Sequence, residues 1–131
     1  MTTIQLIVVF CYAAAIGALI YAIASKLRIG SPVIAAALCA LFTVFTLSQI
    51  GQEGLVTFWS NHTANLTGLQ VWWDLLMATI IAFIFIAPRA RAVGMNMPVW
   101  GLFVVSTASV GLLAMVARLF WLERRSEEAT H

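Results

Sequence analysis

The most informative polar side chain in this chain is a carboxylate inside an apolar run. Asp74 follows Trp72 and Trp73 in Val71–Leu76 (VWWDLL), and Arg118 lies inside a second apolar run near the C-terminus. A charge at such depth in hydrocarbon costs on the order of 2–3 kcal/mol, so it is usually paired or functional. Helical side chains lean toward the N-terminus, which in antiparallel neighbours brings the two groups toward one depth. We predict a structural Asp74–Arg118 pair, with a substrate or proton role for Asp74 as the alternative.

A haem or metal site inside a membrane normally needs an imidazole or another donor there, and the membrane-spanning runs contain no histidine. His62 and His131 both lie outside these runs, and His62 is more typical of a solvated loop histidine than of a surface ligand. Cys11 and Cys39 lie at different depths in apolar runs, as expected of packing residues rather than of a disulfide. No HExxH, CxxC, GxGxxG or P-loop pattern is present. The sequence therefore predicts no catalytic residue set, no metal and no cofactor.

The composition requires a membrane environment for whatever these residues do. Hydrophobic residues make up 63% of the 131 residues, and charged residues only 9%. A soluble domain is about half apolar and a quarter charged, so these few charges could not cover a water-soluble surface. The net charge of +2 is spread over short loops, which is typical of topology signals and not of a nucleic-acid-binding surface. We expect the lipid bilayer as a partner, and no nucleic acid.

The apolar runs predict an all-α membrane protein, a single domain over residues 1–131 in which four helices cross the bilayer up and down. A crossing needs roughly 20 apolar residues, and the expected spans cover about residues 4–25, 32–50, 69–87 and 98–122. Ser31 and Pro32 are a good helix start, as N-cap and first helical residue. Pro98 opens the last span in the same way.

A polar stretch over residues 51–68 separates the second and third spans. Its apolar residues recur at helical spacing, while the polar residues between them face elsewhere. This pattern fits a short amphipathic helix on the membrane surface, and it fits an ordered loop that caps the bundle equally well. The sequence leaves both possibilities open.

Basic residues and tryptophans predict the orientation of the four spans. Four basic residues fall on one side, and two or three on the other, so the positive-inside rule favours both termini outside the cytoplasm. We expect this arrangement in a bacterial inner membrane. The first group comprises Lys26, Arg28, Arg89 and Arg91, and the second comprises Arg124 and Arg125, with Arg118 just inside the membrane. Trp100 marks the first side, and the other tryptophans mark the second.

Small residues indicate where helices approach one another. Gly17 lies in a small-residue stretch of the first span, and Thr107, Gly111 and Ala114 recur three or four residues apart in the last. In lipid, small faces allow close van der Waals contact between backbones. These faces either pack inside the bundle or bind partner membrane proteins, and the sequence leaves both open.

The second half of the chain resembles a bacterial family of small membrane proteins known only as a domain of unknown function. The resemblance covers roughly residues 50–125 and rests on Asp74-Leu75-Leu76, on Arg89–Met95 (RARAVGM), and on the end of the last helix at Leu119–Arg125. Pro88 departs from the family pattern, because an acidic residue often precedes the basic turn there. The resemblance implies no activity, substrate or catalytic residue.

Two functions from different classes follow from these observations. The favoured one is a non-enzymatic accessory or assembly subunit of a larger membrane complex, because few buried polar groups are present to orient a substrate. The alternative is a binder, transporter or modifier of a hydrophobic ligand such as an isoprenoid, quinone or lipid. That function would use a pocket near Asp74 and the Trp72–Trp73 pair.

Overall fold

The computed structural model describes residues 2–26 and 30–130, and these residues form only α-helices and their connections. The all-α prediction is confirmed. Arg28 and His131, which enter the sequence predictions, lie outside the described residues. The helices are α1 (Thr3–Ala24), α2 (Pro32–Glu53), α3 (Leu55–Thr63), α4 (Leu66–Ala92), α5 (Met97–Thr107) and α6 (Ser109–Glu128).

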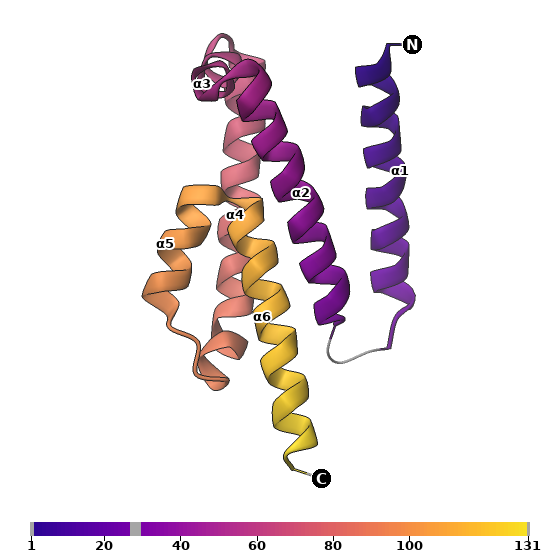
Figure 1. Cartoon of the computed structure of the whole chain (residues 1–131), viewed down its shortest axis with the longest axis vertical. Helices are drawn as coiled ribbons and strands as arrows, with labels where there is room; N and C mark the ends of the chain where they lie inside the picture. Colours follow the sequence, from indigo (N-terminus) through magenta and orange to yellow (C-terminus); the bar gives the residue numbers. More distant parts are fainter. Residues whose placement is uncertain (1, 27–29, 131) are drawn as a thin grey trace.

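Three of the helices, α1, α2 and α4, are long and apolar enough to cross a membrane. At about 1.5 Å per residue, each reaches the roughly 30 Å of a hydrocarbon core. They run alternately up and down in Figure 1 and correspond to the first three predicted spans. The chain therefore has the helices of an integral membrane protein.

The helices begin where polar side chains can satisfy free backbone N–H groups. Thr2 and Gln5 form a reciprocal capping box at α1, with each side chain accepting from the other's backbone N–H. Ser31 caps α2 by accepting from the N–H of residue 34, as predicted for the Ser-Pro start. Asn65 and Asn96 cap α4 and α5 in the same way. These caps are local, which is why the sequence locates them.

The polar stretch between the second and third spans contains a helix and not only a loop. Gly54, at φ +80°, ends α2 in a conformation that favours glycine, and α3 starts at the next residue. α3 crosses the end of the molecule and leads into α4 (Figure 1). Its location at a membrane surface stays a prediction.

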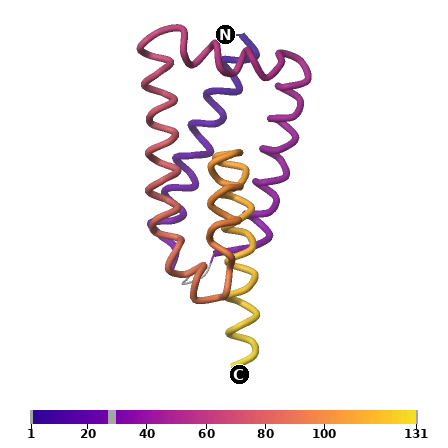
Figure 2. The backbone as a smooth tube through the Cα atoms, turned by 90° about the vertical axis from the view of Figure 1, so that its left-hand side faces the viewer, coloured from indigo at the N-terminus to yellow at the C-terminus, as the bar shows by residue number. Residues whose placement is uncertain are grey.

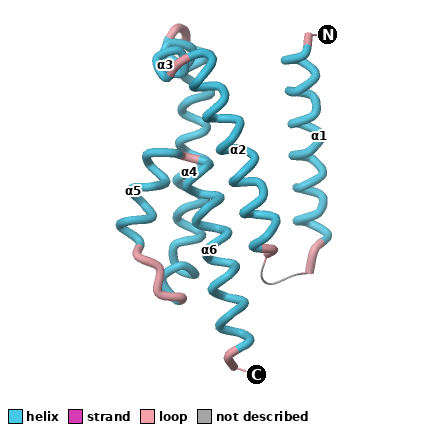
Figure 3. Tube along the Cα trace, viewed as in Figure 1, coloured by secondary structure: helices cyan, strands magenta, loops and turns pink. Residues whose placement is uncertain are grey.

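The prediction of one continuous helix over 98–122 is wrong. The chain reverses at Ala108, which has φ +48° and ψ −112°, and α5 and α6 fold back against each other as a hairpin. Figure 3 shows the short loop at this reversal, and Figure 2 shows the hairpin between α2 and α4. α5 has 11 residues and reaches only about 16 Å, half of a hydrocarbon core.

The hairpin changes which end of the molecule carries the C-terminus. α6 runs back past the turn between α4 and α5, so the N-terminus and the C-terminus lie at opposite ends of the long axis (Figure 1). Four full crossings would have placed both termini at the same end. The two ends of the described chain thus do not lie together in the fold, and the side of a membrane on which each terminus lies stays a prediction. Trp121 lies toward the end with the α4–α5 turn, because Glu123, two residues later, pairs with Arg89 at the end of α4.

The densest packing is around the hairpin. Five buried side chains from the end of α4 through α6 form the core: Ala90, Met95, Val104, Met115 and Leu119. α2 packs along α6, and there the Cys39 thiol lies 3.5 Å from the carbonyl oxygen of Val110. α1 is different, because none of its Cα atoms lies within 8 Å of a Cα atom in another described helix.

Candidate functional site

Asp74 and Arg118 do not meet in this fold. Asp74 is exposed in the first third of α4, at the α3 end of the molecule, and makes no ion pair with any described residue. Arg118 lies at the middle of α6, which runs toward the opposite end, with its guanidinium 4.5 Å from the centre of the Trp121 ring. The reversal at Ala108 separates the two charges, because α6 starts in mid-molecule and runs away from Asp74. The predicted pair is thus not formed.

Trp72 and Trp73 have different environments. Trp72 packs its ring edge-on against Phe58 of α3 at 5.3 Å between ring centres, and lies 5.6 Å from the ring of His62. Nδ1 of His62 donates to the carbonyl of Phe58 at 2.7 Å within α3, and only the contact of its ring with Trp72 reaches α4. Trp73 is exposed on the outer face of α4. The two rings thus have different surroundings, and Trp72 has a packing role against α3.

Among the residues that the structure describes, the ion pair formed joins Arg89 of α4 to Glu123 of α6. Nε and Nη2 of Arg89 donate to the two carboxylate oxygens at 2.8 and 2.6 Å, a two-pronged geometry that only arginine provides. The guanidinium also lies 5.6 Å from the centre of the Phe120 ring. The glutamate side chain is 14% exposed and the arginine 44%. Sequence reasoning missed this pair because the four-span arrangement put its members on opposite sides of the membrane.

We expect a double-mutant cycle to find coupling between Arg89 and Glu123. Arg89→Gln or Glu123→Gln should each lower the free energy of unfolding by about 1 kcal/mol, a figure reduced by the solvent exposure of the arginine. The double variant should recover part of that loss, giving a coupling above the roughly 0.5 kcal/mol expected between independent sites. Chemical unfolding in detergent micelles measures these values. The cycle of Asp74→Asn with Arg118→Leu is the control and should show no coupling.

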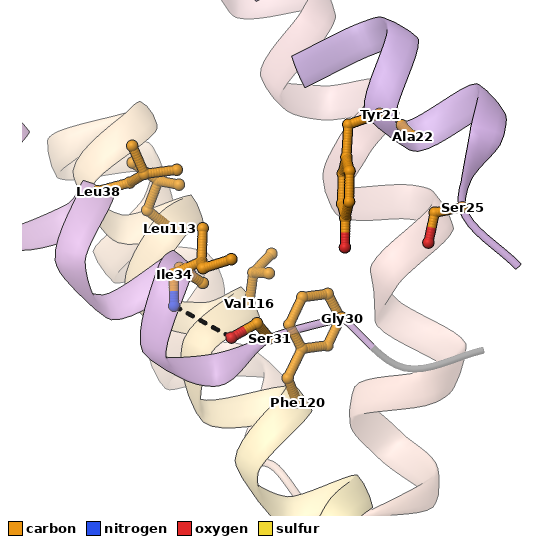
Figure 4. A pocket seen from close by; sticks show the side chains of 11 residues that line it. Tyr21, Ala22, Ser25, Gly30, Ser31, Ile34, Leu38, Leu113, Val116 and Phe120 are labelled. Carbon is orange, nitrogen blue, oxygen red and sulfur yellow. Dashed lines mark hydrogen bonds between the residues drawn. The ribbon is translucent and has the colours of Figure 1, made fainter. Parts of the chain in front are cut away.

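A cavity of about 390 Å³ lies between the end of α1, the start of α2 and residues 113–120 of α6. Figure 4 shows α1 side chains on one side of it and those of α2 and α6 on the other. From α1 the wall includes Tyr21, Ala22 and Ser25; from the start of α2, Gly30, Ser31, Ile34, Ala35 and Leu38; and from α6, Leu113, Val116 and Phe120.

The cavity is polar at one end and apolar along the rest of its length. Ser25 and Ser31 are at its outer end, next to the connection between α1 and α2. Leu38 and Leu113 lie at its inner end, each seven residues along its helix from the outer wall, or about 10 Å deeper. Gly30 packs closely at the outer end, because a Cβ atom there would overlap the ring of Phe120 and that ring would have to shift.

None of the residues proposed from the sequence as a ligand pocket lines this cavity. Asp74, Trp72 and Trp73 belong to the α3–α4 end, whereas the cavity opens beside the start of α2.

No protein-family model, curated protein or solved structure matches the chain. The resemblance to a family of small bacterial membrane proteins therefore stays a prediction. No signal in the sequence identifies the cavity, because its walls come from three segments that only the fold brings together.

The residues predicted to pack between helices differ in whether another part of the described chain contacts them. Gly111 is buried in the α5–α6 hairpin, and the hydroxyl of Thr107 donates to the carbonyl of Phe103 at 2.8 Å on the preceding turn of α5. Ala114 is half-buried on α6. Gly17 has no atom within 4 Å of the position of an added Cβ, so nothing in the described chain packs on it. Among the described residues, no group of three or more His, Cys, Asp or Glu side chains is placed so that it could hold a metal ion.

Proposed function

We propose that this protein binds the hydrocarbon chain of a membrane amphiphile in the cavity between α1, α2 and α6. The observation that carries the proposal is the gradient along the cavity wall, from hydroxyl groups at the outer end to aliphatic side chains at the inner end. Its volume of about 390 Å³ falls within the roughly 300–1,000 Å³ of small-molecule sites. The role is non-enzymatic, and the protein would present or sequester its ligand.

The packing of α1 supports this proposal. α1 forms one wall of the cavity, yet none of its residues is buried and it makes no close backbone contact with another described helix. A hydrocarbon chain between α1 and the other two walls would supply the van der Waals contacts that the helices themselves do not make.

The distribution of charge supports an orientation that differs from the sequence prediction. The described basic residues all lie toward the end that carries the α4–α5 turn and the C-terminus, and no Lys or Arg occurs between Arg28 and Arg89. By the positive-inside rule, this end lies in the cytoplasm of the bacterium and the N-terminus and α3 lie outside. The outer end of the cavity would then face the cytoplasmic leaflet.

Filling the cavity should abolish binding of the hydrocarbon chain. We expect Val116→Phe to reduce the retention of dioleoylglycerol, which has chains but no charged headgroup, by at least about tenfold, or roughly 1.4 kcal/mol. Native mass spectrometry of the protein in mild detergent measures the retained ligand. Val105→Phe makes the same change on α5 at a side chain that is 85% exposed, and should retain the ligand as the unchanged protein does.

Equal retention by both phenylalanine variants would place the ligand elsewhere and overturn the proposal. Loss of folding in Val116→Phe is recognised by its circular dichroism and elution profile. In that event Leu38→Trp fills the same cavity from α2, where its side chain is half-exposed and easier to enlarge.

A second candidate function is the accessory subunit of a larger membrane complex. The specific observation in its favour is also α1, whose whole length is exposed in the described chain and whose Gly17 has open space above it. A partner helix could approach α1 closely at this glycine. Substitution of Gly17 tests this candidate, as set out in the Discussion.

A further inference from the structure

We propose that the occupant of the cavity is an anionic phospholipid, whose phosphate is bound by the guanidinium of Arg124. This inference rests on the proposed function, because it concerns the headgroup of the amphiphile whose chain fills the cavity. It goes beyond that function by naming the charge of the ligand and the residue that recognises it.

Arg124 is joined directly to the cavity wall. Its Nη2 donates to the backbone carbonyl of Gly30 at 3.4 Å, and Gly30 lines the outer end of the cavity. The side chain is exposed, and no other described residue accepts a hydrogen bond from it. Its remaining N–H groups are thus available at the point where the polar end of an amphiphile would emerge.

The neighbouring arginines are engaged in other contacts. Arg118 and Arg125 lie over the ring of Trp121, at 4.5 and 4.9 Å from its centre, and Arg89 is held by the carboxylate of Glu123. Lys26 adds a second exposed cation, since it follows Ser25 of the cavity wall. Charge complementarity therefore favours a negative headgroup over a neutral one at this position.

A planar guanidinium is suited to a phosphate group. It can donate two parallel hydrogen bonds to two phosphate oxygens, which an amide or an ammonium cannot do. A neutral isoprenoid or quinone could occupy the apolar part of the cavity but would leave Arg124 without an acceptor for these bonds. The guanidinium thus favours a phospholipid over the neutral hydrophobic ligands. The two exposed cations, Arg124 and Lys26, favour an anionic phospholipid over a zwitterionic one, because they repel the ammonium group that the zwitterionic headgroup carries.

The test compares two lipids with the same chains and different headgroup charge. The full-length protein in mild detergent is mixed with equal amounts of dioleoylphosphatidylglycerol and dioleoylphosphatidylcholine, and native mass spectrometry measures the bound ratio. We expect the unchanged protein to favour the anionic lipid by about tenfold. Arg124→Gln should reduce this preference to within about twofold. Arg125→Gln removes the same charge from the adjacent residue and should keep the preference.

The outcomes separate this inference from the proposed function. Equal loss in Arg124→Gln and Arg125→Gln would mean a diffuse charge effect and overturn the phosphate site, as would no preference in the unchanged protein. The proposed function stands in either case if the unchanged protein still binds dioleoylglycerol and the Val116→Phe variant does not. Anionic lipid that Val116→Phe fails to displace is bound at the surface and not in the cavity, which would overturn the phosphate site but not the proposed function, because that function depends on the dioleoylglycerol result.

Discussion

Replacing Gly111 by leucine should destabilise the protein by about 3 kcal/mol, the upper part of the usual range for overpacking. A Cβ atom at this position would lie 2.8 Å from the carbonyl oxygen of Phe103 and 2.9 Å from Cα of Val104. Both are backbone atoms of α5 and cannot rotate away, so α5 and α6 must separate. Thermal unfolding in detergent, followed by circular dichroism, measures the loss. Gly111→Ala should also destabilise, although alanine favours a helix by about 1 kcal/mol over glycine.

The matched control is Gly17→Leu on α1. A Cβ atom there meets nothing within 4 Å, so this variant should unfold at the temperature of the unchanged protein. Equal stability of Gly111→Leu and the unchanged protein would argue against the close hairpin and for a continuous helix.

Gly17→Leu also tests the accessory-subunit candidate. Loss of a co-purifying membrane protein from this stable variant would support a partner on α1, and retention of that protein would count against it.

Cysteine labelling should place the two termini on opposite sides of the membrane. In a background with both native cysteines replaced by alanine, we expect an impermeant maleimide added to intact bacterial cells to label Thr3→Cys and Ser60→Cys. Ala92→Cys and Ala129→Cys should be labelled only after the cells are opened. The effect is all-or-none, because the hairpin determines whether the chain after α4 crosses the bilayer again. All four positions are exposed in the structure.

Labelling of both Thr3→Cys and Ala129→Cys in intact cells would restore the four-span arrangement and remove the basis for the Arg89–Glu123 pair. Labelling of Ala92→Cys and Ala129→Cys alone would keep the hairpin and invert the orientation. The experiment therefore tests the fold and the positive-inside argument separately.

Elements encoded by neighbouring residues could be predicted from the sequence. The capping side chains Ser31 and Asn96 act on backbone N–H groups three residues ahead, and proline follows within two residues in both cases. The long apolar runs of α1, α2 and α4 are likewise local. The candidate site was not predictable in this way. Its outer end depends on contact between Gly30 and Phe120, residues 90 positions apart, with no pattern that joins them.

The sequence by itself determined that the chain belongs in a membrane, that it is helical, and where most helices begin. These properties follow from apolar content, hydrophobic runs and caps, each of which acts within a few residues. Only the tertiary structure decided the direction of the last helix. The apolar run continues through Ala108 without Gly or Pro at the reversal, so helix propensity alone favours a straight span. Packing of Gly111 against α5 and of α6 against α2 stabilises the hairpin instead, and it brings Glu123 to Arg89 and Phe120 to the cavity wall.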